Sequence, residues 1–300
     1  MEQYIRNHIA GNIYIDPIQS ASAYQSRAGW VDHRIGPHLL YSHRRNDYTK
    51  ATFDETLHFH EYYELVLYLR GDVDYVCGQS LLSPHPMAAV HFPPGELHNT
   101  RLNTPSHYER HVFYFREDAF RYGEKTYPLW DFLKRSATTA FEIPEQRQPE
   151  LISLLARLEG TLSSATANGL LPFALTVELF SLLEECHTTA ETDTTAALPA
   201  RMLELKSYID EHYASIRSVT DLAARLFYSR EYISRLFRRY YNTSVAGYLA
   251  RYRVRKSLSL LEKGFPVTQV AFDVGFGSMS AYISAFKKYM GIVPSAWHKK

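Results

Sequence analysis

The last third of the chain contains one helical pattern twice, with the two copies about 48 residues apart. In the first copy, Ser218 and Asp221 have the spacing of a capping box, which predicts the start of a short helix. The small residue Ala223 allows a second helix to cross the first one closely, and Ser229 predicts where that second helix begins. This order of helix, turn and helix predicts a helix-turn-helix unit.

The second copy begins after Pro266 and has a small residue at Ala271, a turn at Gly275 and a helix start at Ser278. Glycine can adopt the positive φ that such a turn requires. Apolar residues at helical spacing between the copies predict one longer helix that joins them: Tyr248, Leu249, Tyr252, Leu258, Leu260 and Leu261. We therefore expect residues 199–300 to form an all-α domain.

The formal net charge of +1 conceals a division of the chain into two parts of opposite sign. Residues 199–300 contain 17 Lys and Arg against 7 Asp and Glu, a net charge of +10. Residues 1–198 contain the remaining 16 basic and 25 acidic residues, a net charge of −9. This division predicts that the C-terminal part binds a polyanion such as nucleic acid.

Several elements of the C-terminal part occur in an order and at distances that resemble the AraC/XylS family of transcription regulators. They are residues 227–239, 248–253, 260–261, 270–271, 274–276, 286–288 and 291–294. The resemblance covers about a hundred residues and implies a sequence-specific DNA-binding activator that reads two successive major grooves. It also implies four partners: double-stranded promoter half-sites, RNA polymerase, a second copy in a homodimer and a small-molecule effector. We expect neither catalysis nor a cofactor.

The two predicted recognition helices contain the residues expected to contact DNA. In the first helix these are Arg230, Glu231, Ser234, Arg235 and Arg238. In the second helix they are Met279, Ser280, Ile283, Ser284, Lys287 and Lys288. The two lysines suit phosphate contacts, and Met279 or Ile283 suits contact with thymine methyl groups. Ser284 stands where the family often has arginine, so we expect the second helix to read bases poorly.

Residues 57–115 follow the period of β-strands, with turn signals at residues 70–72, 77–78, 83–86 and 93–96. This spacing predicts an antiparallel sandwich or a cupin-like barrel. The expected fold class of the chain is therefore α+β with several domains. A β-sandwich or cupin-like barrel with two helices comes first, and an all-α domain with two helix-turn-helix units joined by a long helix follows.

Histidines and a glutamate of the β region have the spacing of cupin motifs: His58, His60 and Glu64 fit the first motif, and His98 ends a segment similar to the second. Strand alternation places Tyr68 on the same face as Glu64. These five residues are the expected binding site for a small molecule such as a sugar. A divalent metal held by the three histidines and Glu64 is the less favoured alternative.

Two other functions remain open at this stage. One is a metal-dependent cupin enzyme with a basic DNA-associating tail, which would use the four cupin-motif residues. The other is a protein that coats DNA without sequence preference, because a basic domain binds phosphates whatever the base sequence.

Residues 151–158 and 171–186 have the spacing of two amphipathic helices. Either both helices only cover the sheet, or the leucine stripe from Leu171 to Leu183 contacts a partner subunit, which is the interpretation behind the predicted homodimer. The stretch from Thr188 to Leu198 is rich in Thr and Ala and has no apolar period, so it is predicted to be a linker. The expected domains are 1–187 for ligand sensing and dimerisation, 188–198 as linker and 199–300 for DNA binding.

Composition places the chain among ordinary globular proteins, with 45% hydrophobic and 22% charged residues. No run of about 18 apolar residues is present, and the polar first residues do not resemble a signal peptide. The two cysteines, Cys77 and Cys186, are far apart and suit a reducing compartment. We therefore expect a cytoplasmic location and no membrane partner.

Overall fold

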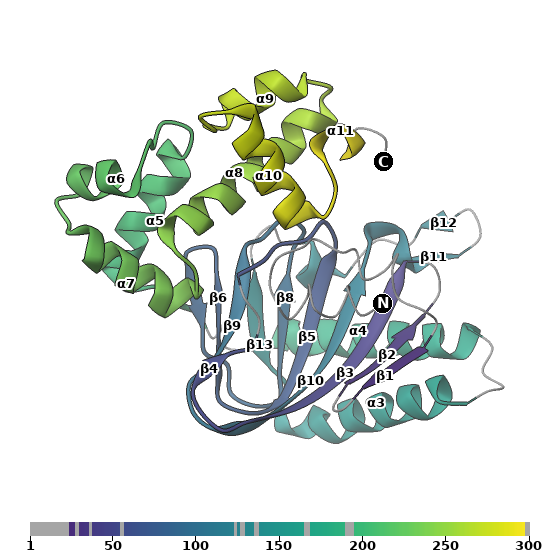
Figure 1. Ribbon diagram of the computed structural model, residues 1–300. Coiled ribbons are helices and arrows are strands. Elements are labelled where there is room, and N and C mark those ends of the chain that lie inside the picture. Colours follow the sequence, from purple (N-terminus) through teal and green to yellow (C-terminus); the bar gives the residue numbers. More distant parts are fainter. Residues whose placement is uncertain are drawn as a thin grey trace.

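The computed structural model describes residues 24–27, 30–35, 38–54, 57–122, 125–126, 130–134, 138–164, 169–189 and 195–297. Two antiparallel sheets face each other, two helices lie against the larger sheet, and the remaining helices gather at one end of the strands (Figure 1). We call residues 24–197 the β domain and residues 200–297 the helical domain. This architecture confirms the predicted fold class.

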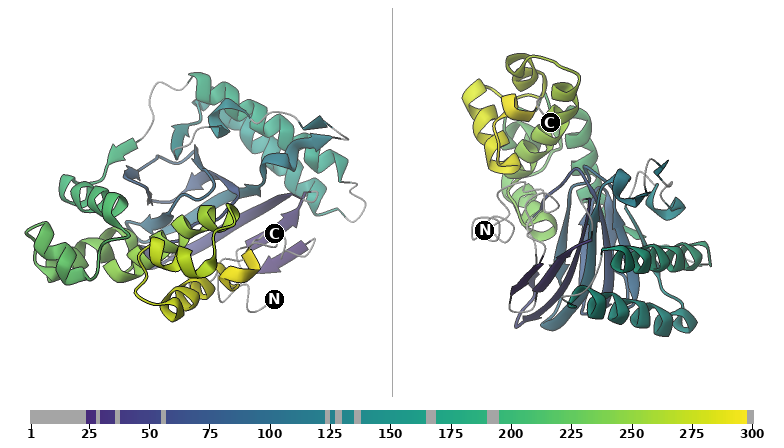
Figure 2. Two further views of the ribbon diagram at one scale, coloured as in Figure 1. Left: turned by 90° about the horizontal axis from the view of Figure 1, so that it is seen from above. Right: turned by 90° about the vertical axis from the view of Figure 1, so that its right-hand side faces the viewer.

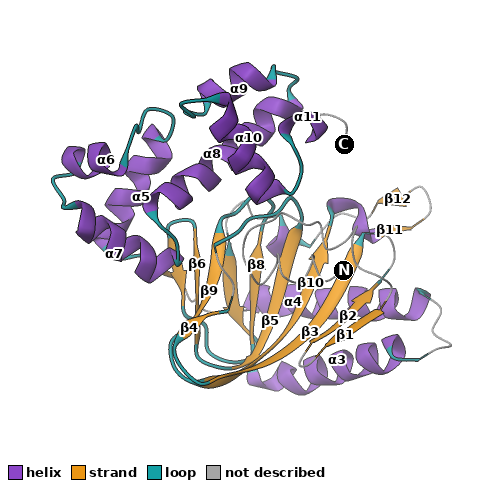
Figure 3. Ribbon diagram, in the orientation of Figure 1, coloured by secondary structure: helices purple, strands orange, loops and turns teal. Residues whose placement is uncertain are grey.

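The larger sheet has seven strands and the smaller sheet has five (Figure 3). In spatial order the larger sheet consists of β1 (Tyr24–Arg27), β2 (Trp30–Arg34), β3 (Leu39–Tyr48), β10 (Ser106–Phe115), β5 (Tyr63–Arg70), β8 (Ala88–Phe92) and β13 (Thr139–Glu142). The smaller consists of β14 (Thr195–Ala197), β7 (Ser80–Leu82), β6 (Val73–Cys77), β9 (His98–Leu102) and β4 (Thr52–Phe53). A two-stranded ribbon is formed by β11 (Arg121–Tyr122) and β12 (Lys125–Thr126).

Strand β5 shows why the larger sheet is buried on both faces. Val66 and Tyr68 belong to the apolar core between the two sheets, whereas Leu65 and Leu67 belong to the core between the larger sheet and its helices. Successive side chains of a strand point to opposite faces, so an almost continuous apolar run can fill two cores. The same alternation points Glu64 into the space between the sheets, together with Val66 and Tyr68.

Helices α3 (Gln148–Leu162) and α4 (Leu170–Thr189) cover the outer face of the larger sheet (Figure 2). Leu175, Leu179 and Leu183 are at most 2% exposed and pack in the core against that sheet. The prediction that this leucine stripe contacts a partner subunit is therefore wrong, because a helix covering a sheet requires the same apolar spacing. Leu170 and Leu171 at the start of α4 remain exposed. Homodimerisation itself stays a prediction.

Most of the described residues in the predicted linker, 188–198, belong to a helix or a strand. Residues 188–189 end α4, and residues 195–197 form β14, which pairs with β7 at the edge of the smaller sheet. Residues 190–194 lie outside the described part of the chain. The last linker residue, Leu198, is buried in the core of the helical domain. Sequence composition could not predict this strand, because a sheet edge pairs through backbone groups that every residue except proline offers.

The helical domain consists of α5 (Ala200–His212), α6 (Val219–Arg225), α7 (Arg230–Tyr241), α8 (Val245–Glu262), α9 (Val267–Asp273), α10 (Met279–Met290) and α11 (Pro294–Trp297). The predicted capping residues are confirmed. Ser218, Ser229 and Ser278 each accept a hydrogen bond on the side-chain oxygen from the backbone N–H three residues on, at the start of α6, α7 and α10. None of the helices within the described residues combines the length and apolar character needed to cross a membrane.

The turns of the two helix-turn-helix units share one backbone conformation. Gly275 has φ +92°, and Phe227 occupies the corresponding place in the first unit with φ +55°. In both turns this residue and the next donate hydrogen bonds to the last residues of the preceding helix. A left-handed phenylalanine is uncommon, and the Phe227 side chain is 95% exposed. Of these two residues, only Gly275 is of a type that indicates such a turn in the sequence.

Candidate nucleic-acid interface and candidate ligand site

Helix α7 presents a polar face to solvent because its apolar residues pack inside the helical domain. Ile233, Phe237 and Tyr241 are fully buried in the helical domain. Of the predicted DNA contacts on this helix, Arg230, Glu231, Arg235 and Arg238 are exposed and Ser234 is half-buried. The Ser234 hydroxyl donates to the Arg230 carbonyl within the helix. The arrangement is a helix with buried apolar residues on one side and a row of cations on the other, which suits the major groove.

Helix α10 is built in the same way but has fewer charges. Tyr282 and Phe286 are fully buried, and Ser278 caps the helix. Its predicted DNA contacts divide into two groups: Ser280, Ser284, Lys287 and Lys288 are exposed, and Met279 and Ile283 are half-buried. All eleven predicted residues of the two recognition helices are therefore accessible to some degree. Their contacts with DNA stay predictions.

Helix α8 holds the two units at a set separation. Its 18 residues span about 27 Å at the usual rise of an α-helix. Arg253 is only 9% exposed, and it donates hydrogen bonds of 2.6–2.9 Å to the carbonyls of Tyr213 and Ile216 in the segment between α5 and α6. Burial lowers the pKa of this guanidinium. Arg253 therefore connects α8 to the segment that follows α5, although a basic residue in a basic domain would suggest a contact with DNA.

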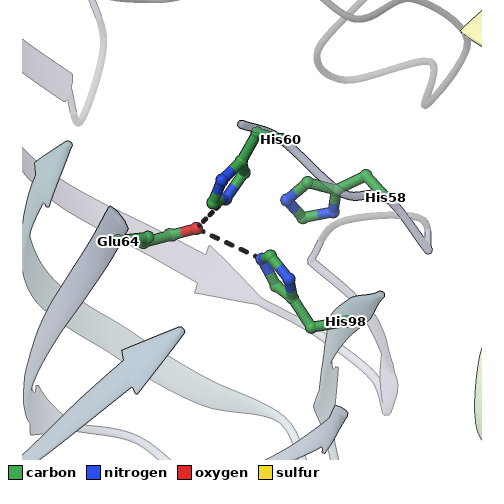
Figure 4. Close-up of side chains that lie close together, drawn as sticks. All are labelled: His58, His60, Glu64 and His98. Carbon is green, nitrogen blue, oxygen red and sulfur yellow. Dashed lines mark hydrogen bonds and ion pairs between the residues drawn. The ribbon is translucent and has the colours of Figure 1, made fainter. Parts of the chain in front are cut away.

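Four of the five predicted ligand residues form one cluster, and their sequence neighbours Leu57, Phe59 and Leu97 belong to the apolar core of the helical domain (Figure 4). One potential ligand atom from each of His58, His60, Glu64 and His98 lies within 4.8 Å of the other three. His60, Glu64 and His98 are at most 4% exposed, and His58 is half-buried. Tyr68 lies further along β5 and is packed against Tyr108, with ring centroids 6.0 Å apart.

Stacked aromatic rings orient the histidines of the cluster. Tyr62 lies parallel to His60 at a centroid distance of 4.1 Å, and Phe92 lies almost parallel to His98 at 4.2 Å. Hydrogen bonds to backbone carbonyls also orient the two rings. Nδ1 of His60 lies 2.8 Å from the carbonyl oxygen of Tyr62, and Nδ1 of His98 lies 2.9 Å from the carbonyl oxygen of Glu96. The two Nε2 atoms then face one Glu64 oxygen at 2.8 and 3.2 Å.

The charge of Glu64 is maintained by these neighbours. Burial alone would raise the pKa of the carboxyl group, but its hydrogen bonds to His60 and His98 outweigh burial and hold that pKa well below its usual range. The cluster therefore contains a buried carboxylate among imidazole rings. Such a donor set can hold a divalent transition-metal ion or bind a polar ligand.

A second cluster lies on the opposite face of the larger sheet and was not predicted. His43 of β3 and His111 of β10 are register partners with rings stacked at 3.9 Å. Glu159 of α3 bonds to His43, and the Tyr41 hydroxyl bonds to both His111 and Glu159. Burial and the adjacent His43 lower the pKa of His111 to about 3. This network connects the sheet to α3.

Comparison with known proteins shows which family model matches the C-terminal region and which curated proteins are similar to the chain. Residues 222–300 match a protein-family model described as a helix-turn-helix domain. The Msm operon regulatory protein of Streptococcus mutans is 31% identical over 123 residues, which cover 41% of this chain and 44% of that protein. The uncharacterized HTH-type transcriptional regulator YdeC of Bacillus subtilis is 35% identical over 100 residues, which cover 33% of this chain and 34% of that protein.

A solved structure is similar to about a third of the chain. The C-terminal domain of the two-component response regulator yesN from Fusobacterium nucleatum is 26% identical with a TM-score of 0.32, and the match covers 33% of this chain and 99% of that one. The chain spans less than half the length of the two curated relatives described above. Both are named as regulators and neither as an enzyme, in agreement with the expectation of a non-catalytic chain.

Proposed function

We propose that this chain is a sequence-specific DNA-binding transcription regulator of the AraC type, since residues 222–300 match a helix-turn-helix family model and a curated relative is named as a regulatory protein. We further propose that it is an activator controlled by a small ligand bound in the β domain. Promoter half-sites, RNA polymerase and a second copy of the chain are its proposed partners. The proposed location is the cytoplasm, where the DNA is.

One observation carries this proposal: two capped recognition helices, α7 and α10, expose polar faces while α8 holds them in one domain. A recognition helix enters the major groove with the side chains of its exposed face toward the base edges. Arg235 has the best position for a base contact, because it is exposed on the middle of α7. An arginine can donate two hydrogen bonds to one guanine, which specifies that base.

The specificity of Arg235 can be tested with the full chain on DNA selected from a random pool. Arg235→Ala should cost about 1–3 kcal/mol of binding free energy and relax discrimination at one base pair, because one bidentate contact is lost. Affinities for the selected sequence and its single-base variants measure both effects. Arg157→Ala is the matched control, since this exposed arginine lies on α3 in the β domain.

Two outcomes would contradict the proposal in different ways. Equal weakening on every sequence would make Arg235 a phosphate contact and remove its role in specificity. Absence of any preferred sequence in the selected pool would support the DNA-coating interpretation. The metal-dependent enzyme is the weaker alternative, because the two curated relatives described above are named as regulators.

A further inference from the structure

The first helix-turn-helix unit holds a large apolar side chain almost entirely in solvent. Phe227, in the turn between α6 and α7, is 95% exposed, so burial of its ring contributes almost nothing to the folded chain. Its backbone has φ +55°, a left-handed conformation that is unfavourable for a residue with a Cβ atom. Neither core packing nor backbone preference therefore explains a phenylalanine at this position.

Hydrogen bonds hold the turn around this residue. The backbone N–H groups of Phe227 and Tyr228 donate to carbonyls of α6 at 3.3 and 3.0 Å. The Tyr228 hydroxyl accepts from Nη1 of Arg201 and donates to Glu204, both at 2.6 Å. The exposed ring is thus carried on a backbone that is already ordered. A partner that covers the ring does not have to order this turn, which lowers the cost of binding.

The second unit shows where the fold itself demands a particular residue in this turn. Gly275 has the same left-handed conformation, and a Cβ atom added to it would lie 2.3 Å from the Ala214 carbonyl oxygen. Packing therefore requires glycine there. The exposed Phe227 meets no such demand, and a glycine would adopt its conformation at lower cost. Unfavourable backbone conformations that folding does not require are typical of sites that contact a partner.

Phe227 also lies at the edge of the surface that the proposed function directs toward DNA. It precedes Ser229, the capping residue of α7, by two positions. The N-terminal residues of a recognition helix contact the base edges in the major groove. Side chains connect the turn with Arg235, because the rings of Tyr228 and Tyr232 lie 5.3 Å apart and the Arg235 guanidinium lies 6.0 Å from the Tyr232 ring centre.

Charge favours DNA over a protein as the partner of this ring. Residues 199–300 carry a net charge of +10, and Arg230 and Arg235 of α7 are exposed. An apolar protein surface that covered Phe227 would also remove these arginines from water, whereas DNA offers them phosphates and guanine edges. The apolar group that DNA presents in the major groove is the 5-methyl group of thymine, and phenylalanine is one of the side chains that contact it.

We propose that Phe227 determines specificity by placing its ring on the 5-methyl group of a thymine in the half-site read by α7. This inference rests on the proposed function. The helix from Ser229 to Arg235 spans about 9 Å, and the two residues before it span up to about 7 Å. At about 3.4 Å per base pair, the thymine lies within about five base pairs of the base pair that Arg235 reads.

Replacing thymine by deoxyuridine tests this contact, because it removes only the methyl group. Each thymine of the DNA sequence selected by the full chain is replaced in turn, and affinities are measured for wild type and Phe227→Gly. Wild type should bind about fourfold more weakly at one position, since one apolar carbon is no longer buried. Phe227→Gly should bind the unmodified DNA at least about fourfold more weakly, with no further loss at that position.

Three further measurements control for damage to the fold. Phe227→Gly should unfold at the same temperature as wild type or a higher one, because glycine has no Cβ atom to oppose φ +55°. Phe227→Asn should show the same binding loss, since asparagine also accepts this conformation without the flexibility of glycine. Leu171→Ala is the matched control, because it truncates an exposed apolar side chain of the β domain. It should leave DNA affinity unchanged.

Several results would overturn the inference while leaving the proposed function in place. They are a wild-type chain that responds to no uracil, a Phe227→Gly variant that binds as tightly as wild type, and a variant that binds more weakly but responds to uracil as wild type does. Unchanged DNA binding with loss of transcription activation in Phe227→Gly would assign the ring to RNA polymerase instead. A wild-type chain that selects no DNA sequence would refute the proposed function and this inference together.

Discussion

Gly275→Ala is expected to destabilise the helical domain by about 3 kcal/mol or more. The backbone of Gly275 has φ +92°, a conformation that costs a residue with a Cβ atom about 1–2 kcal/mol. An added Cβ would also lie 2.3 Å from the carbonyl oxygen of Ala214 and 2.7 Å from its Cα. These are backbone atoms, so the segment between α5 and α6 would have to move, at a further cost of about 1–3 kcal/mol.

Gly277→Ala provides the matched control for this substitution. It lies two residues away in the same turn, and an added Cβ would meet no atom within 4 Å. Urea unfolding followed by helical circular dichroism compares both variants with wild type. A loss of less than about 1 kcal/mol in Gly275→Ala would mean that the second turn does not pack against Ala214 as described.

Replacing His91 with leucine should remove about 2 kcal/mol of pH-dependent destabilisation between pH 7 and pH 5. His91 on β8 is fully buried, and neither ring nitrogen has a hydrogen-bond partner among the described residues. Burial lowers its pKa to about 3. Below its ordinary value of about 6.5, the unfolded chain binds a proton there that the folded chain does not. Stability therefore falls as the pH falls below 6.5, by about 1.4 kcal/mol per pH unit.

Other groups contribute to the same pH range, so the difference between variant and wild type is the quantity to measure. His111, with a pKa lowered to about 3 by burial and by His43, acts in the same direction as His91. Glu61 acts in the opposite direction, because burial and the nearby Glu262 raise its pKa to about 7. Urea midpoints at pH 5, 6 and 7 for wild type, His91→Leu and the exposed control His85→Gln isolate the contribution of His91. An unchanged slope in His91→Leu would refute this explanation.

Local signals in the sequence predicted most of the helical domain. Ser218, Ser229 and Ser278 cap helices because a hydroxyl reaches a backbone N–H three residues away, which depends on few other residues. The left-handed turn at Phe227 could not be predicted in this way. Its conformation accompanies hydrogen bonds from Phe227 and Tyr228 to carbonyls of the preceding helix, and a phenylalanine gives no sign of it.

Long-range pairing limited what could be predicted for the β domain. The cupin spacing predicted that His60, Glu64 and His98 meet, because the motif encodes the strand arrangement. The contact between His43 and Glu159 joins residues 116 positions apart and depends on how α3 docks. Helical spacing of Leu175 was equally compatible with packing on the sheet and with a partner subunit. The docking of the helical domain on β6 and β9 had no signal in the sequence.

A footprint of the full chain on its selected DNA tests most directly whether this protein reads DNA with two helices. Hydroxyl-radical cleavage should show two protected regions on one face of the duplex, about 10 base pairs apart, as the proposed entry of α7 and α10 into successive major grooves requires. In the double variant Lys287→Ala and Lys288→Ala, protection should be lost from one region and kept in the other. A single protected region that this variant leaves unchanged, or continuous protection of any DNA sequence, would contradict the account.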